Sequence, residues 1–268
     1  MISVDLSKKD FQVFILGMTG NFRNQIEIDK RYSELNISQI DAFNPKSPEV
    51  NEIELNSRVF HFWYNRGITK KEAACALGHR KIINLAYLEN KDFVLILEDD
   101  AVIPSLDEIR EHSLLLKREI PTLLLLANNI NTVLLSKRSQ KLLGNRYKKC
   151  LSIPTHTQAY ALNRSAIELI HREQQNRNLD SLADYPPWYS EFLEFIICLT
   201  PDSIAPAQTS TIGIEGRNSP KSNFLRRVYR FSFLAWLLEG RRYCNLLAYT
   251  RFVHGRAIGS IQMKFIKK

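Results

Sequence analysis

Apolar residues come in short, nearly continuous runs along this chain, and longer segments of mixed polarity separate the runs. Apolar runs of this length, bounded by turn residues, are typical of strands buried in the sheet of an α/β protein. The pattern predicts strands at the following positions: 11–16, 37–43, 94–97, 122–127 and 155–162. A further apolar run occupies residues 195–199.

The segments between these runs carry helix signals. Thr69 and Glu72 have the spacing of a capping box, in which each side chain satisfies a backbone N–H of the other residue. Small and apolar residues then recur at helical spacing as far as Tyr87, which predicts a helix that packs closely on the sheet. Further helices are expected at 21–35, at 105–118 and after a cap at Asn163 or Ser165. The order of strands and helices predicts an α/β fold with a mostly parallel central sheet.

Three consecutive carboxylates follow the strand at 94–97, and we call them the acidic triplet: Glu98, Asp99 and Asp100. Ligands of α/β proteins bind just outside the carboxyl ends of the strands, where this triplet is expected. Three adjacent negative charges repel one another unless solvent or a cation compensates them. Carboxylate oxygens suit Mg²⁺ or Mn²⁺, usually together with substrate phosphates. The triplet therefore indicates either a metal site or a solvated acidic strand end.

The charge of the chain is unevenly distributed. Its 268 residues carry a net charge of +9, and the segment 217–268 holds twelve Lys/Arg residues against one acid, Glu239. The remaining 216 residues carry 25 basic and 27 acidic groups and are near neutral. This contrast predicts a body at 1–216 and a basic extension at 217–268 that binds an anionic partner: a membrane surface, a lipid-linked phosphate or a nucleic acid.

Arginines and large aromatic residues are mixed within this extension, at 225–238. That composition is typical of an amphipathic helix at an anionic membrane interface, and equally of a helix that packs on the body with a basic outer face. The N-terminus shows no charged segment followed by an apolar one, and no stretch approaches the roughly 18 apolar residues of a spanning helix. We therefore expect a cytoplasmic protein, peripheral to the inner face of the cytoplasmic membrane.

The four cysteines are widely scattered: Cys75, Cys150, Cys198 and Cys244. They form neither a CxxC motif nor another recognised Cys/His spacing, which argues against a structural zinc site. Cys75 and Cys198 stand among apolar residues, where a reduced core thiol is expected.

Two segments together resemble glycosyltransferase family 25, the enzymes of bacterial lipooligosaccharide synthesis with relatives that glycosylate collagen. The segment 71–79 resembles the family's Gly-Glu-x-Gly-Cys-x-x-Ser-His, and the acidic triplet resembles the Glu-Asp-Asp end of the strand that follows it. Weaker matches at 157–160 and at Gln208-x-Ser210 extend the resemblance over roughly residues 10–215. The chain departs from the pattern at Lys71, Ala74 and Gly78 and keeps Glu72, Cys75 and His79.

The resemblance implies a GT-A-like fold, a nucleotide-binding α/β sandwich in which an acidic motif holds a divalent metal ion. It implies a nucleotide-sugar donor, expected to be a UDP-hexose, and a glycan or glycolipid acceptor. These implications are physically coherent, because the diphosphate leaving group needs a cation to neutralise its developing charge. The family also implies transfer with inversion of configuration.

The first candidate site residues belong to the acidic triplet and to the helix before it. Because side chains alternate along a strand, Glu98 and Asp100 are expected on one side as ligands of Mn²⁺ or Mg²⁺, if the strand continues. Asp99 would then face the ribose or sugar of the donor, whereas a turn would break this alternation. Glu72 serves either as a helix cap or in catalysis. His79, two turns later, either binds donor or acceptor or is a hydrogen-bonded structural residue.

Later segments supply three more candidates. Asp184 lies in a Pro-rich loop. It is either the general base that takes the proton of the acceptor hydroxyl in an inverting displacement, or a surface acid. Gln158 and Ser210 are candidate contacts of the sugar or the pyrophosphate.

These features predict a metal-dependent glycosyltransferase that moves a hexose, galactose or glucose, from a UDP-sugar to a lipooligosaccharide or similar surface glycan. The departures at Ala74 and Gly78 leave open a catalytically weak, glycan-binding relative. The basic extension suggests a third possibility, a nucleic-acid-binding protein. The near-neutral body carries no recognised nucleic-acid-binding motif, so we expect no nucleic-acid partner.

Overall fold

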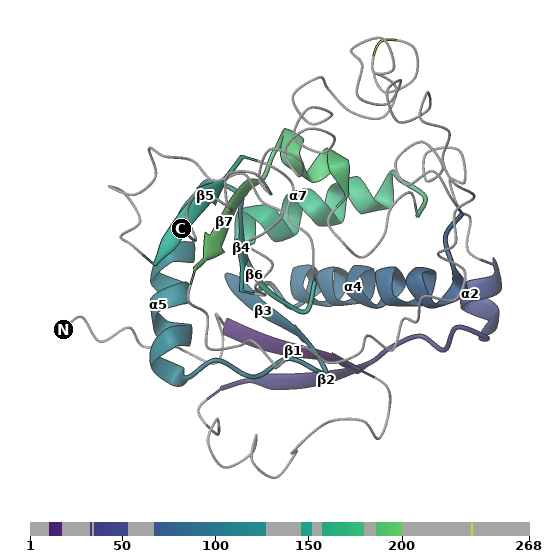
Figure 1. The fold of residues 1–268 in the computed structure, drawn as a ribbon, viewed down its shortest axis with the longest axis horizontal. Helices are drawn as coiled ribbons and strands as arrows, with labels where there is room; N and C mark the ends of the chain where they lie inside the picture. The colour runs from purple at the N-terminus through teal and green to yellow at the C-terminus, as the bar shows by residue number, and fades with distance from the viewer. Residues whose placement is uncertain are drawn as a thin grey trace, which may run out of the picture.

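The structure of this protein, a computed structural model, describes residues 11–17, 33, 35–52, 67–126, 146–151, 157–179, 186–199 and 237. In that part of the chain seven strands form one sheet, and helices pack against it (Figure 1). Across the sheet the strands are β2 (Ile37–Asp41), β1 (Phe11–Gly17), β3 (Phe93–Glu98), β6 (Ala159–Asn163), β4 (Thr122–Leu125), β7 (Glu194–Cys198) and β5 (Tyr147–Cys150). The α/β class is confirmed, and the arrangement is compatible with the Rossmann-like glycosyltransferase fold that the resemblance implies.

Five of these seven strands run in one direction. β1 pairs in parallel with both β2 and β3, and β4 pairs in parallel with β7. β6 lies antiparallel between β3 and β4, and β5 is an antiparallel edge strand beside β7. Most strands therefore share one direction, as predicted, but the sheet contains antiparallel pairs as well as parallel ones. An apolar run does not encode the direction in which a strand enters the sheet, so the strand expected at 155–162 was predicted but the antiparallel direction of β6 was not.

The side chains of the buried strands, such as β3, alternate between two buried layers. On one face, Val94 and Ile96 of β3 join a core with α4 (Lys70–Leu88) and α7 (Arg164–Gln175), which lie side by side in Figure 1. On the other face, Leu95 and Leu97 pack with α5 (Leu106–Leu116). Both faces of β3 are thus shielded from water, which explains its continuous apolar run.

The three longer helices α4, α5 and α7 begin where the sequence predicts. The Thr69 hydroxyl accepts from the N–H of Glu72 at 3.3 Å, while the Glu72 carboxylate accepts from the N–H of Thr69 at 3.0 Å, so the capping box of α4 is confirmed. Ser105 caps α5. Asn163, one of the two residues expected to cap α7, does so, and its side chain also accepts from the N–H of Thr122 at the start of β4.

Two short elements were not predicted. Residues 187–188 were expected in a loop, but they begin a 3₁₀ helix, Pro187–Glu191, whose Trp188 is anchored in the core shared with α4 and α7. The short helix α2 (Pro48–Glu52) interrupts a region expected to be irregular, and its Val50 packs against alanines of α4. In both cases buried side chains fix a short segment whose sequence gives no periodic signal: Val50 in α2, and Trp188 with Tyr189 in the 3₁₀ helix.

Strand β5 was also not predicted, because its sequence is half polar. Tyr147 and Cys150 are buried, and the two lysines between them are partly exposed. Lys149 forms an ion pair at 3.0 Å with Glu194 of β7, which also pairs with Arg118. This edge of the sheet is therefore held by charges as well as by apolar contacts.

Two predicted elements fall outside the described residues. The helix expected at 21–35 is described at residues 33 and 35 alone, and the basic extension at Leu237 alone. The boundary between 216 and 217 and the helical character of the extension stay predictions. In the described part of the chain, no helix combines the length and the apolar character needed to cross a membrane.

Candidate functional site

The candidate site lies at the carboxyl ends of the parallel strands β1 and β3, beside the start of β6. Glu98 is the last residue of β3, and its side chain points toward α4. Asp99 and Asp100 form a turn, which a hydrogen bond of 2.9 Å from the N–H of Ala101 to the carbonyl of Glu98 closes. The alternation expected through the acidic triplet therefore stops at Glu98.

Two neighbouring side chains hold the carboxylate of Glu98. The hydroxyl of Thr157 donates to Oε1 of Glu98 at 2.6 Å, and Nε2 of His79 lies 3.3 Å from the same oxygen. Nδ1 of His79 lies 3.0 Å from the hydroxyl of Tyr160 in β6, and both rings are buried. His79 is thus hydrogen-bonded within the fold, as one of its two predicted roles requires. Donor or acceptor binding by His79 stays a prediction.

Cys75 lies beside this network. It stands four residues before His79 in α4, a spacing that places both side chains on one face of the helix. One ligand atom each from Cys75, His79 and Glu98 lies within 4.8 Å of the other two. Burial raises the pKa of Tyr160 well above its ordinary value, and the neighbouring Tyr189, Glu98 and Cys75 raise it further, so its hydroxyl stays protonated.

The two aspartates of the triplet have different surroundings. A Cβ atom at Gly17, the last residue of β1, would come within 2.6 Å of the Asp99 Cβ and 2.8 Å of its Oδ2, so glycine leaves the space that this carboxylate occupies. Oδ1 of Asp100 is buried and, among the residues that the structure describes, has no hydrogen-bond partner. A buried carboxylate oxygen normally has a donor or a cation beside it, so Asp100 fits a metal ligand.

Gln158 fixes the turn of the acidic triplet by two hydrogen bonds. Its carbonyl accepts from the N–H of Glu98 at 2.8 Å, and its side-chain amide donates to the carbonyl of Asp100 at 3.4 Å. The expected contact of Gln158 with a sugar or pyrophosphate stays a prediction. Asp184 and Ser210 lie outside the described residues, and their expected roles stay predictions as well.

Glu72 is placed as the cap of α4. Its side chain is buried, and Oε2 accepts from both the N–H and the hydroxyl of Thr69 at 3.0 Å. These are the contacts that the capping box predicts. A catalytic role of Glu72 stays a prediction, and the substitution Glu72→Gln can test it.

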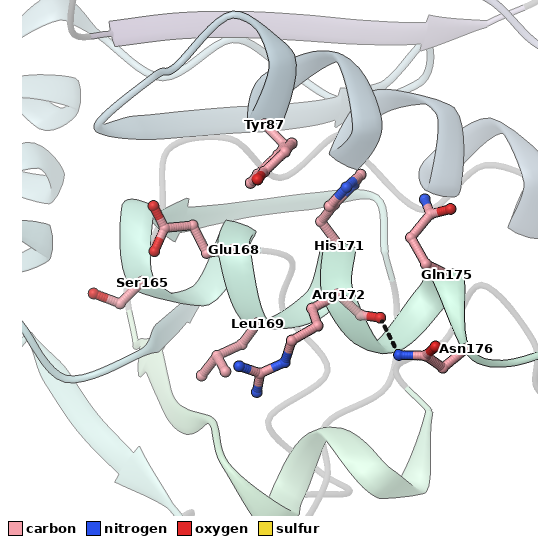
Figure 2. Close-up of a pocket in the computed structure, with 8 residues that line it drawn as sticks. All are labelled: Tyr87, Ser165, Glu168, Leu169, His171, Arg172, Gln175 and Asn176. Carbon is pink, nitrogen blue, oxygen red and sulfur yellow. Dashed lines mark hydrogen bonds between the residues drawn. The ribbon is translucent and has the colours of Figure 1, made fainter.

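A pocket of about 520 Å³ lies on α7 (Figure 2). Tyr87 of α4 and His171 of α7 stack there with their ring centroids 3.9 Å apart. The other residues that line it all come from α7 or its end: Ser165, Glu168, Leu169, Arg172, Gln175 and Asn176. None of the described lining residues belongs to the predicted site, so we assign this pocket no part in the chemistry.

The meeting of Cys75 with His79 and Glu98 was not predicted. Cys75 was expected to be a core thiol, but it is only half-buried. Its four-residue spacing from His79 in a predicted helix was the available signal. The sequence does not show that α4 covers the face of β3 on which Glu98 lies, so Glu98 could not be placed beside Cys75 and His79. Thr157 and Tyr160 contact Glu98 and His79 because β6 runs antiparallel beside β3, which was not predicted either.

Comparison with known proteins adds a family assignment. The model of the family described as "Glycosyltransferase family 25 (LPS biosynthesis protein)" matches residues 11–181. The match runs from β1 past the end of α7 and includes the acidic triplet, Cys75, His79 and Gln158. It covers more than half of the chain and confirms the resemblance seen in the sequence. A comparison with curated proteins gave no match.

Proposed function

This chain belongs to glycosyltransferase family 25, and we propose that it transfers a hexose, galactose or glucose, from a UDP-sugar to a lipooligosaccharide or similar surface glycan. The description of the family as an LPS biosynthesis protein supports a glycan or glycolipid acceptor. The position of the acidic triplet supports a nucleotide-sugar donor, because α/β proteins bind such ligands at the carboxyl ends of their parallel strands.

The buried Oδ1 of Asp100 is the observation that carries this proposal. In the described part of the chain no group donates to that oxygen, and its chemistry fits a hard divalent cation, Mn²⁺ or Mg²⁺. Asp100 would hold the ion together with phosphate oxygens of the donor. Glu98, expected as a second ligand, is engaged with His79 and Thr157, so Asp100 is the stronger assignment. When bound, the ion supplies charge neutralisation at the diphosphate leaving group.

The residues around Asp100 give the turn one fixed geometry. Gln158 holds its backbone, Thr157 and His79 hold Glu98, and Gly17 leaves space for Asp99. We assign Asp99 to the ribose or sugar of the donor. A turn fixed in advance does not need to reorganise when charge develops on the leaving group, which lowers the barrier to transfer.

The acceptor hydroxyl must lose a proton during a direct, inverting displacement. We assign Asp184 as the base, because it is an acid in a proline-rich stretch of the sequence, three residues before the 3₁₀ helix Pro187–Glu191. Gln158 and Ser210 are assigned as contacts of the sugar or pyrophosphate. Glu72 is kept as the cap of α4.

Turnover with a panel of nucleotide sugars tests the proposal. We expect full-length protein to use a UDP-hexose with Mn²⁺ or Mg²⁺ and to lose activity in excess EDTA. Asp100→Asn keeps the shape of the side chain and removes its charge, so turnover should fall about 100-fold or more. Asp92→Asn is the matched control, because Asp92 is exposed at the opposite end of the same strand and should keep full activity.

Two results would contradict this assignment in different ways. Full activity of Asp100→Asn, or full activity in EDTA, would remove the metal from the mechanism. No turnover with any donor, together with measurable glycan binding by the folded protein, would favour a glycan-binding relative that lacks catalysis.

We also propose that the basic extension, residues 217–268, binds an anionic membrane surface. Its twelve Lys/Arg residues against one acid, mixed with aromatic residues, support this partner. Such binding would place the enzyme at the inner face of the cytoplasmic membrane, where a lipid-linked acceptor is within reach.

A further inference from the structure

We propose that Cys75, His79 and Glu98 bind a zinc-class transition metal ion, at a site separate from the one assigned to Asp100. The three side chains supply a thiolate, an imidazole and a carboxylate, which are the donors of four-coordinate zinc sites. Mn²⁺ and Mg²⁺ favour sites built from oxygen, so this donor set selects a different class of ion. The inference goes beyond the proposed glycosyltransferase activity and does not depend on it.

The distances within the cluster suit such an ion after a small adjustment. Bonds of about 2.0–2.3 Å in a tetrahedral zinc site place the ligand atoms about 3.3–3.6 Å from one another. Nε2 of His79 and Oε1 of Glu98 already lie 3.3 Å apart. The Sγ of Cys75 lies within 4.8 Å of a ring nitrogen of His79 and of a carboxylate oxygen of Glu98, so the side chains must shift to bring the sulfur to a bonding distance.

His79 has the support that a metal-bound imidazole requires. Such an imidazole usually donates its second ring N–H to an oxygen, which fixes the tautomer and the orientation of the ring. Nδ1 of His79 lies 3.0 Å from the Tyr160 hydroxyl, so Nδ1–H can donate to Tyr160 while the Nε2 lone pair faces the ion. Thr157 fixes the Glu98 carboxylate by donating a hydrogen bond of 2.6 Å to Oε1, which keeps a further lone pair for the ion.

The place of the cluster in the fold indicates what the ion would do. The side chain of His79 is 8% exposed and that of Glu98 is 26% exposed, so the ion would be largely shielded from water. Binding converts the Cys75 thiol to a thiolate and releases its proton to solvent. Three protein ligands leave one tetrahedral position for water. The ion would join α4 to the last residue of β3 and so hold the turn that carries Asp100.

Substitution by cobalt tests the site directly. Full-length protein stripped of metal is titrated with Co²⁺ alone, because tetrahedral Co²⁺ with a thiolate ligand shows visible d–d bands and a near-ultraviolet charge-transfer band. We expect one equivalent of Co²⁺ to bind with both signals and Zn²⁺ to displace it. A folded protein that shows no charge-transfer band would overturn the proposal and leave the cluster as a hydrogen-bonded network.

Two cysteine variants identify the ligand. Cys75→Ala should abolish the charge-transfer band, and it should fold because alanine is the best helix former and alanines flank this position. Cys150→Ala is the control, since Cys150 is buried in β5 and outside the cluster, and this variant should keep the band. Circular dichroism and thermal melting check the fold of each variant. A band that persists in folded Cys75→Ala would overturn the proposal.

Two further variants separate this site from the one proposed for the sugar donor. Tyr160→Phe keeps the ring but removes the oxygen that orients His79, so the affinity for Co²⁺ should fall about 10- to 100-fold. An unchanged affinity would contradict this role of Tyr160. Asp100→Asn should keep the cobalt spectrum of the wild type even though turnover falls, and loss of the spectrum in that variant would contradict a separate site.

Discussion

The carboxylate of Asp99 occupies the space that a side chain at position 17 would fill. In Gly17→Ala the new methyl group would meet Asp99 at 2.6 Å, so the acidic turn must shift. Overpacking of this kind typically costs about 1–3 kcal/mol. We expect that loss in the free energy of unfolding, measured by urea denaturation, together with a fall in donor turnover.

Gly67→Ala is the matched control for this substitution, because among the described residues, its chain neighbours aside, no atom lies within 4 Å of a Cβ at Gly67. It should change neither stability nor turnover by a measurable amount. Equal unfolding free energies for the two variants would contradict the packing of Asp99 against β1. Neither effect was predictable from the sequence, because the contact exists only once β1 and β3 are paired in parallel.

The packing around Gly78 explains one departure from the family pattern. A Cβ at this position would meet Cδ1 of Leu16 at 2.8 Å, so a serine, which the family has here, would have to displace a buried leucine of β1. The packing of Leu16 against α4 therefore gives a physical reason for glycine at this position. The structure gives no comparable reason for Lys71 or Ala74.

Among the elements, those with local signals were predicted and those that depend on sheet order were not. Thr69, Ser105 and Asn163 cap helices through hydrogen bonds to residues three positions away, so the sequence contains the whole signal. Strand β5 contains two lysines, and it is held beside β7 partly by the hydrogen bond from Lys149 to Glu194, which lies far along the chain. No window of sequence contains both partners.

The start of α4 yields a prediction that separates a cap from a catalytic residue. Glu72→Gln should change the free energy of unfolding by less than about 0.5 kcal/mol, because glutamine also serves in a capping box. Thr69→Ala should cost about 1 kcal/mol. We expect donor turnover of Glu72→Gln to stay near that of the wild type, with stability and turnover measured on the same preparations.

Ser105→Ala, which removes the cap of a helix that carries no candidate site residue, is the control for a loss of stability alone. Its turnover per folded molecule should equal that of the wild type. If instead Glu72→Gln lost turnover while its melting temperature stayed constant, Glu72 would be assigned a catalytic role and not only a capping role.

At the scale of the whole molecule, the motifs identified the site but not its internal contacts. The segment 71–79 and the acidic triplet indicated a shared site, and the structure brings them together because α4 covers the face of β3 on which Glu98 lies. Which members touch was not predictable. Cys75 and His79 lie close to Glu98, whereas Asp100 stands in a turn, because the strand ends two residues earlier than the expected alternation requires.

The basic extension gives the last prediction, which concerns how the whole chain meets a surface. Each Lys or Arg near an anionic leaflet contributes about 1 kcal/mol to binding, an effect that salt screens. Full-length protein should therefore float with anionic vesicles at low salt and not with neutral ones. Reversing three charges should weaken this binding by at least about 3 kcal/mol, or more than 100-fold, while hydrolysis of a soluble donor survives. The variant carries Arg226→Glu, Arg227→Glu and Arg230→Glu.

A second triple variant tests whether the place of these charges matters or only their sum. It reverses three exposed lysines of the body and changes the net charge by the same amount: Lys71→Glu, Lys81→Glu and Lys117→Glu. If the extension is the anchor, this variant keeps its vesicle binding, because the charges it loses do not face the membrane. Equal losses in both variants would mean that net charge alone drives adsorption. If the full-length wild type ignored anionic vesicles and the extension variant unfolded, the aromatic residues at 225–238 would be part of the body's packing and not an anchor.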